Sequence, residues 1–140
     1  MVSRRDYTAA ELESKLIDKG YDRETASAAV ASLASIRIID DRRVAAAHVR
    51  TAAAIKGRGR LRIARELAAR GVSREIITTA LGEVAREDEL ASIRKILARK
   101  RWPTSPSRLE RQRMYRHLLA RGFPADLISR ALGGRDDEDE

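Results

Sequence analysis

One stretch of this chain, RGRLRIARELAARGVSREIITTAL at residues 58–81, returns 51 residues later as LERQRMYRHLLARGFPADLISRAL. A fainter copy lies 51 residues earlier. The shared places hold glycine at Gly20, Gly71 and Gly122, leucine at Leu16, Leu67 and Leu118, and a cation at Lys19, Arg70 and Arg121. A repeat of this length is typical of helical arrays, in which each unit covers the apolar face of its neighbour. The sequence therefore predicts three versions of one small helical unit.

The local signals in these units are helical. Thr8 and Glu11 form a capping-box pattern at the start of a helix, and Gly20 follows as its stop. Asp22 caps the next helix, which we expect to bury Ala26, Ala29, Val30 and Leu33. No segment alternates apolar and polar residues for long enough to predict a strand. The predicted fold class is all-α, built from tandem three-helix repeats in an elongated, curved array.

The boundaries follow the same signals. Residues 1–39 form a truncated first unit with two helices, because the chain begins where a first helix should already have ended. Residues 40–84 form the second unit, whose first helix opens at Asp40 and runs to about Ile55, and residues 85–134 form the third. In the third unit Ser105 and Pro106 fit the N-cap and first position of a helix. Residues 135–140 are predicted to be a disordered acidic tail.

The charge points to a polyanionic partner. The formal net charge is +8 even though residues 136–140 are all acidic, so the rest of the chain is more basic still. Either nucleic acid or an acidic protein surface would suit this balance. The excess of arginine over lysine is explained equally well by a GC-rich genome, but that does not account for the net charge.

The remaining composition predicts a cytoplasmic monomer. There is no apolar run long enough to cross a membrane and no cysteine, and the opening MVSRRDY is too polar for a signal peptide. Without thiols there is neither a disulfide nor thiolate chemistry. We therefore expect no membrane partner.

The sequence offers little for catalysis. HExxH, CxxC and GxxxxGK are all absent, so we predict no catalytic, cofactor-binding or metal-binding residues and no enzyme. His48 shares a helical face with Val44 and Ile55, which favours a packed or half-buried side chain. His117 takes the place of Glu66, which favours a solvated one. The run from Gly57 to Arg60 could form a phosphate-binding turn but is better explained as a helix junction.

Arginines gather on one helical face of the second and third units, at or near i, i+4 and i+7 spacing. This arginine ridge consists of Arg58, Arg62, Arg65, Arg111, Arg113 and Arg116. A helical wheel places the stripe opposite Ile63 and Leu67, so we expect it to face outward and bind a partner. The alternative is an ordinary solvated face. Arg70 and Arg121 precede glycines at helix ends, where the helix dipole alone explains a cation.

Four motifs resemble the RecX family, regulators of the RecA recombinase. They are RDYTAAEL at residues 5–12 with KLIDKGY behind it, IDDRRVA at residues 39–45, GRLRI at residues 59–63 leading into Glu66, Leu67 and Arg70–Val72, and LLARGF at residues 118–123. Together they span almost the whole chain. The family often has Gly-Tyr before the paired aspartates, where this chain has Arg37 and Ile38, and Phe after them, where this chain has Val44.

The resemblance implies a non-enzymatic regulator made of tandem three-helix repeats with a basic concave surface. It implies binding to the RecA filament on single-stranded DNA, with inhibition of filament growth, ATPase, strand exchange and co-protease activity. Single-stranded DNA is a second expected partner. The main alternative is a helical nucleic-acid-binding module that contacts phosphates and acts without a recombinase.

Overall fold

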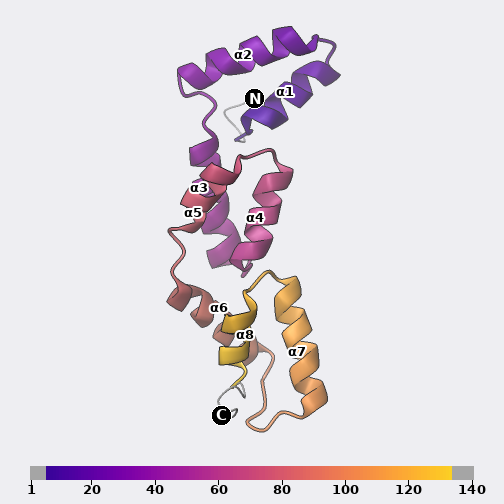
Figure 1. The fold of residues 1–140 in the computed structure, drawn as a ribbon, viewed down its shortest axis with the longest axis vertical. Coiled ribbons are helices and arrows are strands. Elements are labelled where there is room, and N and C mark those ends of the chain that lie inside the picture. The colour runs from indigo at the N-terminus through magenta and orange to yellow at the C-terminus, as the bar shows by residue number, and fades with distance from the viewer. Residues whose placement is uncertain (1–5, 134–140) are drawn as a thin grey trace.

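The computed structural model describes residues 6–133, which form eight α-helices and one π-helical segment and contain no strand (Figure 1). The elements are α1 (Ala9–Asp18), α2 (Arg23–Ser35), α3 (Asp41–Arg50), η1 (Thr51–Ile55), α4 (Arg60–Ala69), α5 (Arg74–Leu81), α6 (Arg86–Arg99), α7 (Arg108–Ala120) and α8 (Ala125–Ala131). They stack along one long axis, with α1 and α2 at one end and α6 to α8 at the other. The predicted all-α repeat fold is confirmed.

The helix ends follow the local signals in most places. Thr8 caps α1 in a capping box, accepting a hydrogen bond from Glu11 N at 3.0 Å while its own N–H donates to the Glu11 carboxylate at 3.0 Å. η1 continues α3 as far as Ile55, as predicted. The prediction that Ser105 caps the last long helix was wrong. Ser107 is the N-cap of α7, because it forms a second capping box with Glu110.

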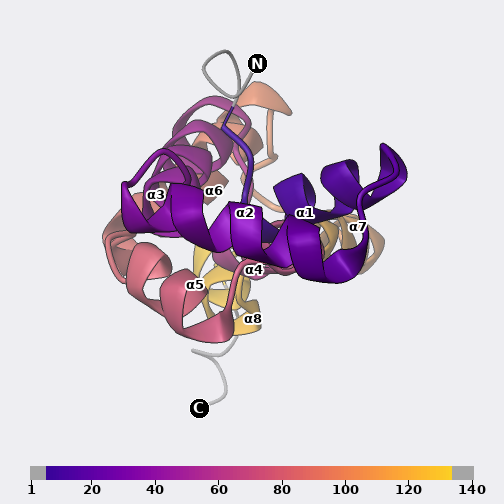
Figure 2. The ribbon, with the colours of Figure 1, turned by 90° about the horizontal axis from the view of Figure 1, so that it is seen from above.

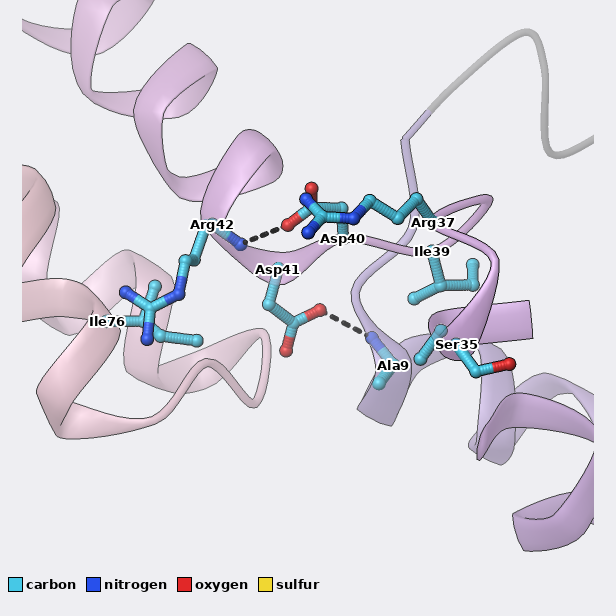
Figure 3. Close-up of a pocket in the computed structure, with 9 residues that line it drawn as sticks. Ala9, Ser35, Arg37, Ile39, Asp40, Asp41, Arg42 and Ile76 are labelled. Atoms are coloured by element: carbon cyan, nitrogen blue, oxygen red, sulfur yellow. Dashed lines mark hydrogen bonds between the residues drawn. The ribbon is translucent and has the colours of Figure 1, made fainter. Parts of the chain in front are cut away.

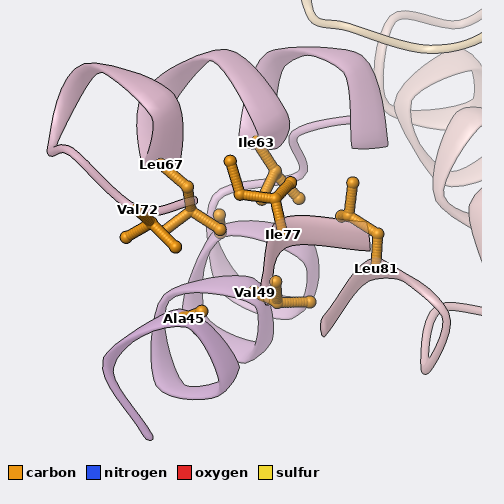
Figure 4. Close-up of a cluster of buried hydrophobic side chains, with 8 residues drawn as sticks. Ala45, Val49, Ile63, Leu67, Val72, Ile77 and Leu81 are labelled. Atoms are coloured by element: carbon orange, nitrogen blue, oxygen red, sulfur yellow. The ribbon is translucent and has the colours of Figure 1, made fainter. Parts of the chain in front are cut away.

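Each unit has its own apolar core. In the second unit α3, α4 and α5 enclose a cluster to which Val49, Ile63, Leu67 and Ile77 contribute (Figure 4). The third unit packs α6 and α7 against α8 around Phe123, which is fully buried. The first unit has a smaller core of Leu12, Val30 and Ile39. Within α2 the expected burial of Ala29 was wrong: the helix turns this residue to solvent while Ala26 and Val30 are buried.

Successive units meet through a repeated joint. The turn after α4 lies on the N-terminus of α1, where Thr8 Oγ1 donates to the Arg70 carbonyl at 2.6 Å. The turn after α7 lies in the same way on the N-terminus of α4, where Gly59 N donates to the Arg121 carbonyl at 2.8 Å. Gly59 lies 51 residues after Thr8, and Arg121 lies 51 residues after Arg70, so the two pairs are equivalent in the repeat. The joints therefore align α1, α4 and α7 along one side of the molecule, as Figures 1 and 2 show.

Gly71 and Gly122 make this approach possible. Both adopt positive φ angles, +87° and +98°, which fit glycine at the end of a helix. A β-carbon on Gly71 would overlap Ala10, and one on Gly122 would overlap the backbone of Arg62. Gly71 is therefore favoured both by its left-handed conformation and by the close contact across the joint.

Candidate partner-binding surface

Half of the arginine ridge faces solvent. Arg65 on α4 and Arg113 and Arg116 on α7 are exposed, and their side chains form no hydrogen bond or ion pair with other residues in the range 6–133. We call these three residues the exposed trio. Because α4 and α7 follow each other along the same side of the molecule, the trio is available to one elongated partner (Figure 1).

The other three ridge residues, Arg58, Arg62 and Arg111, are held within the protein, and we call them the paired trio. Arg58 precedes α4 rather than lying on it, so the expected helical stripe through Arg58 was wrong. Its Nη1 lies 2.7 Å from Glu66 Oε2, and Arg62 Nε lies 3.2 Å from the same oxygen. Arg111 Nη1 donates to the Leu132 carbonyl at 2.7 Å and so caps the end of α8.

Glu66 is the centre of a small polar cluster. His48 Nε2 lies 2.8 Å from Glu66 Oε1, opposite the two arginines, and the Glu66 side chain is only 23% exposed. Burial raises the pKa of Glu66, but the hydrogen bond to His48, the charge of Arg58 and the hydrogen bond from Arg62 outweigh it, so the pKa lies below its ordinary value. The expectation of a half-buried His48 is confirmed.

Two arginines assigned to the helix dipole in fact link neighbouring units. Arg70 reaches Glu11 with two nitrogens, at 2.7 and 2.9 Å, and also donates to the Asp6 carbonyl. Arg121 donates to the carbonyls of Gly57 at 3.2 Å and Lys56 at 2.9 Å. The signal that could have revealed them is their 51-residue spacing, which they share with Thr8 and Gly59, the residues that they face.

A buried ion pair joins the second and third units. Glu89 in the first turn of α6 is 3% exposed and lies 2.9 Å from Arg60 Nε through Oε1. Its Oε2 accepts from Arg60 N at 2.8 Å, and Arg60 Nη2 donates to the Val84 carbonyl at 2.7 Å. All these groups find partners, which a buried carboxylate requires. Sequence reasoning missed this contact because the two residues lie in different units.

A cavity of about 480 Å³ lies between the first two units, with lining residues from α1, α2, α3, α5 and the link before α3 (Figure 3). Its two carboxylates are already engaged. Asp41 Oδ1 accepts from Ala9 N at 2.8 Å, and Asp40 caps α3 through Arg42 N at 3.1 Å. Arg37 and Arg42 contribute cations, so the lining has balanced charge, and its polar groups serve the joint between the units.

A second cavity, of about 540 Å³, lies beside α7 in the third unit. We call it the Trp102 cavity, and it is lined by Lys100, Arg101, Trp102, Pro103, Glu110, Arg113, Met114 and His117. The prediction of a solvated His117 was wrong. Its ring is half-buried, and its Nε2 is buried without a hydrogen-bond partner among the described residues. Burial and the nearby charges of Lys100 and Arg121 lower the pKa of His117, which keeps the ring neutral at neutral pH.

The described part of the chain contains no group of three or more histidine, aspartate or glutamate side chains placed to hold a metal ion. Among the helices between residues 6 and 133, none has the length and apolar character needed to cross a bilayer.

Comparison with known proteins identifies the family. Three family models match in order along the chain: the RecX first three-helix domain at residues 1–33, the second at residues 40–81 and the third at residues 87–132. The chain belongs to the RecX family. A relative named Regulatory protein RecX from Chromobacterium violaceum is 36% identical, over 99% of this chain and 88% of its own length. Another of that name from Halorhodospira halophila is 35% identical, over 100% of this chain and 86% of its own length.

Solved structures agree on the fold. The crystal structure of RecX from Lactobacillus salivarius matches with a TM-score of 0.86 and 22% identity, over 94% of this chain and 87% of that one. A second RecX crystal structure matches with a TM-score of 0.83 and 22% identity, and there the chain spans 66% of the other protein. The same stack of helical units therefore holds at low sequence identity.

Proposed function

We propose that this protein binds the RecA filament on single-stranded DNA and inhibits filament growth, ATP hydrolysis, strand exchange and co-protease activity. The observation that carries the proposal is the match of all three RecX domains in order along the chain. The relatives named Regulatory protein RecX support a regulatory role rather than an enzymatic one.

The shape and charge of the molecule support the same proposal. A nucleoprotein filament presents repeating subunits and DNA phosphates along a groove, and an elongated basic molecule can contact several of them at once. In this proposal the exposed trio makes those contacts, because Arg65, Arg113 and Arg116 have no internal partner within residues 6–133 to give up. The paired trio contributes only if its contacts with Glu66 and Leu132 break.

The proposal is tested by RecA-catalysed ATP hydrolysis on single-stranded DNA. The purified protein should slow hydrolysis at substoichiometric amounts, because one molecule that obstructs a growing filament acts on many subunits. A variant with the exposed trio replaced by alanine should need a higher concentration for the same effect. Unchanged hydrolysis at stoichiometric excess of folded protein would contradict the proposal.

A nucleic-acid-binding module that acts without a recombinase is the alternative, and the net charge of +8 favours it equally. In that case the exposed trio would contact phosphates of bare DNA. Binding measured separately on bare single strands and on RecA filaments distinguishes the two. A loss on bare DNA alone in the alanine variant favours the module, and a loss on filaments alone favours a protein groove.

A further inference from the structure

We propose that the Trp102 cavity binds one nucleotide of a single-stranded nucleic acid, with the base packed against Trp102 and the phosphate held by Lys100, Arg101 and Arg113. This inference deepens the proposed function, on which it rests, by naming where the strand would touch the protein. The cavity volume of about 540 Å³ lies within the range of roughly 300 to 1,000 Å³ that is usual for small-molecule sites.

The charge of the cavity suits a phosphate. Lys100, Arg101 and Arg113 are exposed at its edge, and Glu110 is the single carboxylate in the lining. That carboxylate accepts from Ser107 N at 2.7 Å in the capping box and keeps its negative charge, so three cations face one carboxylate. The net charge of the lining is therefore positive, which is what a nucleotide phosphate requires.

The wall of the cavity suits a base. Trp102 is the only tryptophan of the chain, and it is half-buried, with Met114 beside it in the lining. Both residues pack against the core of the third unit, so the ring is held in place. Aromatic side chains of this kind serve as stacking platforms for the bases of single strands, whatever the sequence of the strand.

The backbone conformation of Arg101 indicates that its side chain has a role beyond packing. It adopts a positive φ angle of +57° in the turn that ends α6, where Arg101 N donates to the Ala98 carbonyl and Trp102 N to the Leu97 carbonyl. Glycine would fit this turn without strain, so arginine is unfavourable for the backbone there. A cation at the edge of a binding cavity would explain the residue.

His117 supplies a polar group that lacks a partner. Its buried Nε2 has no hydrogen-bond partner among the described residues, although buried polar atoms are normally satisfied. If the His117 ring turns toward the cavity that it lines, this neutral imidazole nitrogen can donate to or accept from the edge of a base or a sugar oxygen. An acidic protein side chain would pair with the cations, but it would leave both the aromatic wall and this nitrogen unused.

The single tryptophan makes a direct experiment possible. Oligothymidylate is titrated into the full-length protein without RecA, and tryptophan fluorescence is followed together with the anisotropy of a labelled strand. We expect saturable quenching in step with binding. An abasic strand should bind more weakly and quench the fluorescence little. Free thymidine monophosphate should not saturate the protein at the same nucleotide concentration.

Three variants test the parts of the cavity by anisotropy. Trp102→Leu should bind about tenfold more weakly and Trp102→Phe should bind nearly as well as wild type, because one base on an aromatic ring contributes roughly a factor of ten. Arg101→Gly should keep or raise the melting temperature, since it relieves backbone strain, and should still bind more weakly. Arg74→Ala on α5 removes the same charge from a surface outside the cavity and serves as the control.

Several outcomes would overturn the proposal. Binding without quenching would show that the strand binds elsewhere on the protein. Equal losses of affinity in Arg101→Gly and Arg74→Ala would show that only the net charge of the protein matters. Equal quenching by the abasic strand would show that the base does not enter the cavity. Tight binding of the monophosphate would show that the cavity is a site for free nucleotides. RecA inhibition by the same variants is measured in parallel. If inhibition persists while quenching fails, the cavity proposal alone is wrong.

Discussion

Arg70 and Glu11 form a two-pronged ion pair across the joint between the first two units, with nitrogen–oxygen distances of 2.7 and 2.9 Å. The pKa of Arg70 is raised by its hydrogen bonds to Glu11, so the guanidinium stays charged throughout the accessible pH range. The pair joins residues 59 positions apart in the sequence. It is one of the contacts that hold the first unit against the second.

A double-mutant cycle should measure this contact. Arg70→Ala and Glu11→Ala should each destabilise the protein, and the coupling energy between them should be about 1 to 2 kcal/mol, as expected for a half-buried, two-pronged pair. Urea unfolding of the four proteins gives the value. Glu11→Ala combined with Arg74→Ala is the control and should be additive to within about 0.5 kcal/mol. Additivity of the Arg70 pair as well would mean that the contact adds nothing to stability.

The three equivalent glycines should differ in their tolerance of alanine. All have positive φ angles, so each substitution carries backbone strain of about 1 to 2 kcal/mol. A β-carbon at Gly20 has nothing within 4 Å, whereas at Gly71 and Gly122 it overlaps the neighbouring unit. Those two variants should lose about 1 to 3 kcal/mol more than Gly20→Ala. Similar melting temperatures for all three variants would contradict the close joints.

Alanine substitutions in the two trios of the arginine ridge should have different effects, one on binding and the other on stability. Alanine at the exposed trio should change the free energy of unfolding by no more than about 0.5 kcal/mol. It should also lower the salt dependence of single-strand binding by about 0.7 in log–log slope for each lost phosphate contact. Alanine at the paired trio removes the same charge and should destabilise by at least about 1 kcal/mol, because Glu66 and the Leu132 carbonyl lose partners. If alanine at the paired trio weakened binding and alanine at the exposed trio did not, the binding surface would have to be assigned to the paired trio.

Acid should remove the stabilisation that ionised Glu66 provides. Because the pKa of Glu66 is lower in the folded protein than in the unfolded chain, its contribution is complete above the unfolded value and is lost as the pH falls through the folded value. The stability difference between wild type and Glu66→Gln should therefore shrink as the pH falls below the ordinary value of 4.5 and through the lower folded value. Glu75→Gln, at an exposed position on α5, controls for the change in net charge. A difference that does not vary with pH would contradict the assignment.

Local signals in the sequence were enough to predict the helices. The capping box at Thr8, the glycine stops and the apolar spacing around Ile63 and Leu67 act within a few residues, so they can be recognised without the fold. The error at Ser105 has the same origin, since two serines near a proline compete as caps. The choice fell to Ser107 because Glu110 lies three residues beyond it.

Contacts between separate helices and turns could not be predicted by local reasoning. Arg121 has an adequate local explanation before Gly122, yet its side chain reaches carbonyls 64 and 65 residues away. Arg58 and Arg111 looked like outward cations because helical spacing cannot show a carboxylate or a carbonyl supplied by another element. The Trp102 cavity was missed for the same reason, since its lining joins a turn to a helix that follows it.

The chemical difference between the two joints has a mechanical consequence. At the first, the ion pair of Arg70 with Glu11 is weakened by salt, whereas at the second Arg121 binds neutral carbonyls and the pair of Arg60 with Glu89 is shielded by burial. We therefore expect bending stiffness to differ along the molecule. As ionic strength rises, the arm formed by α1 and α2 should swing more freely, while α3 to α8 should bend less.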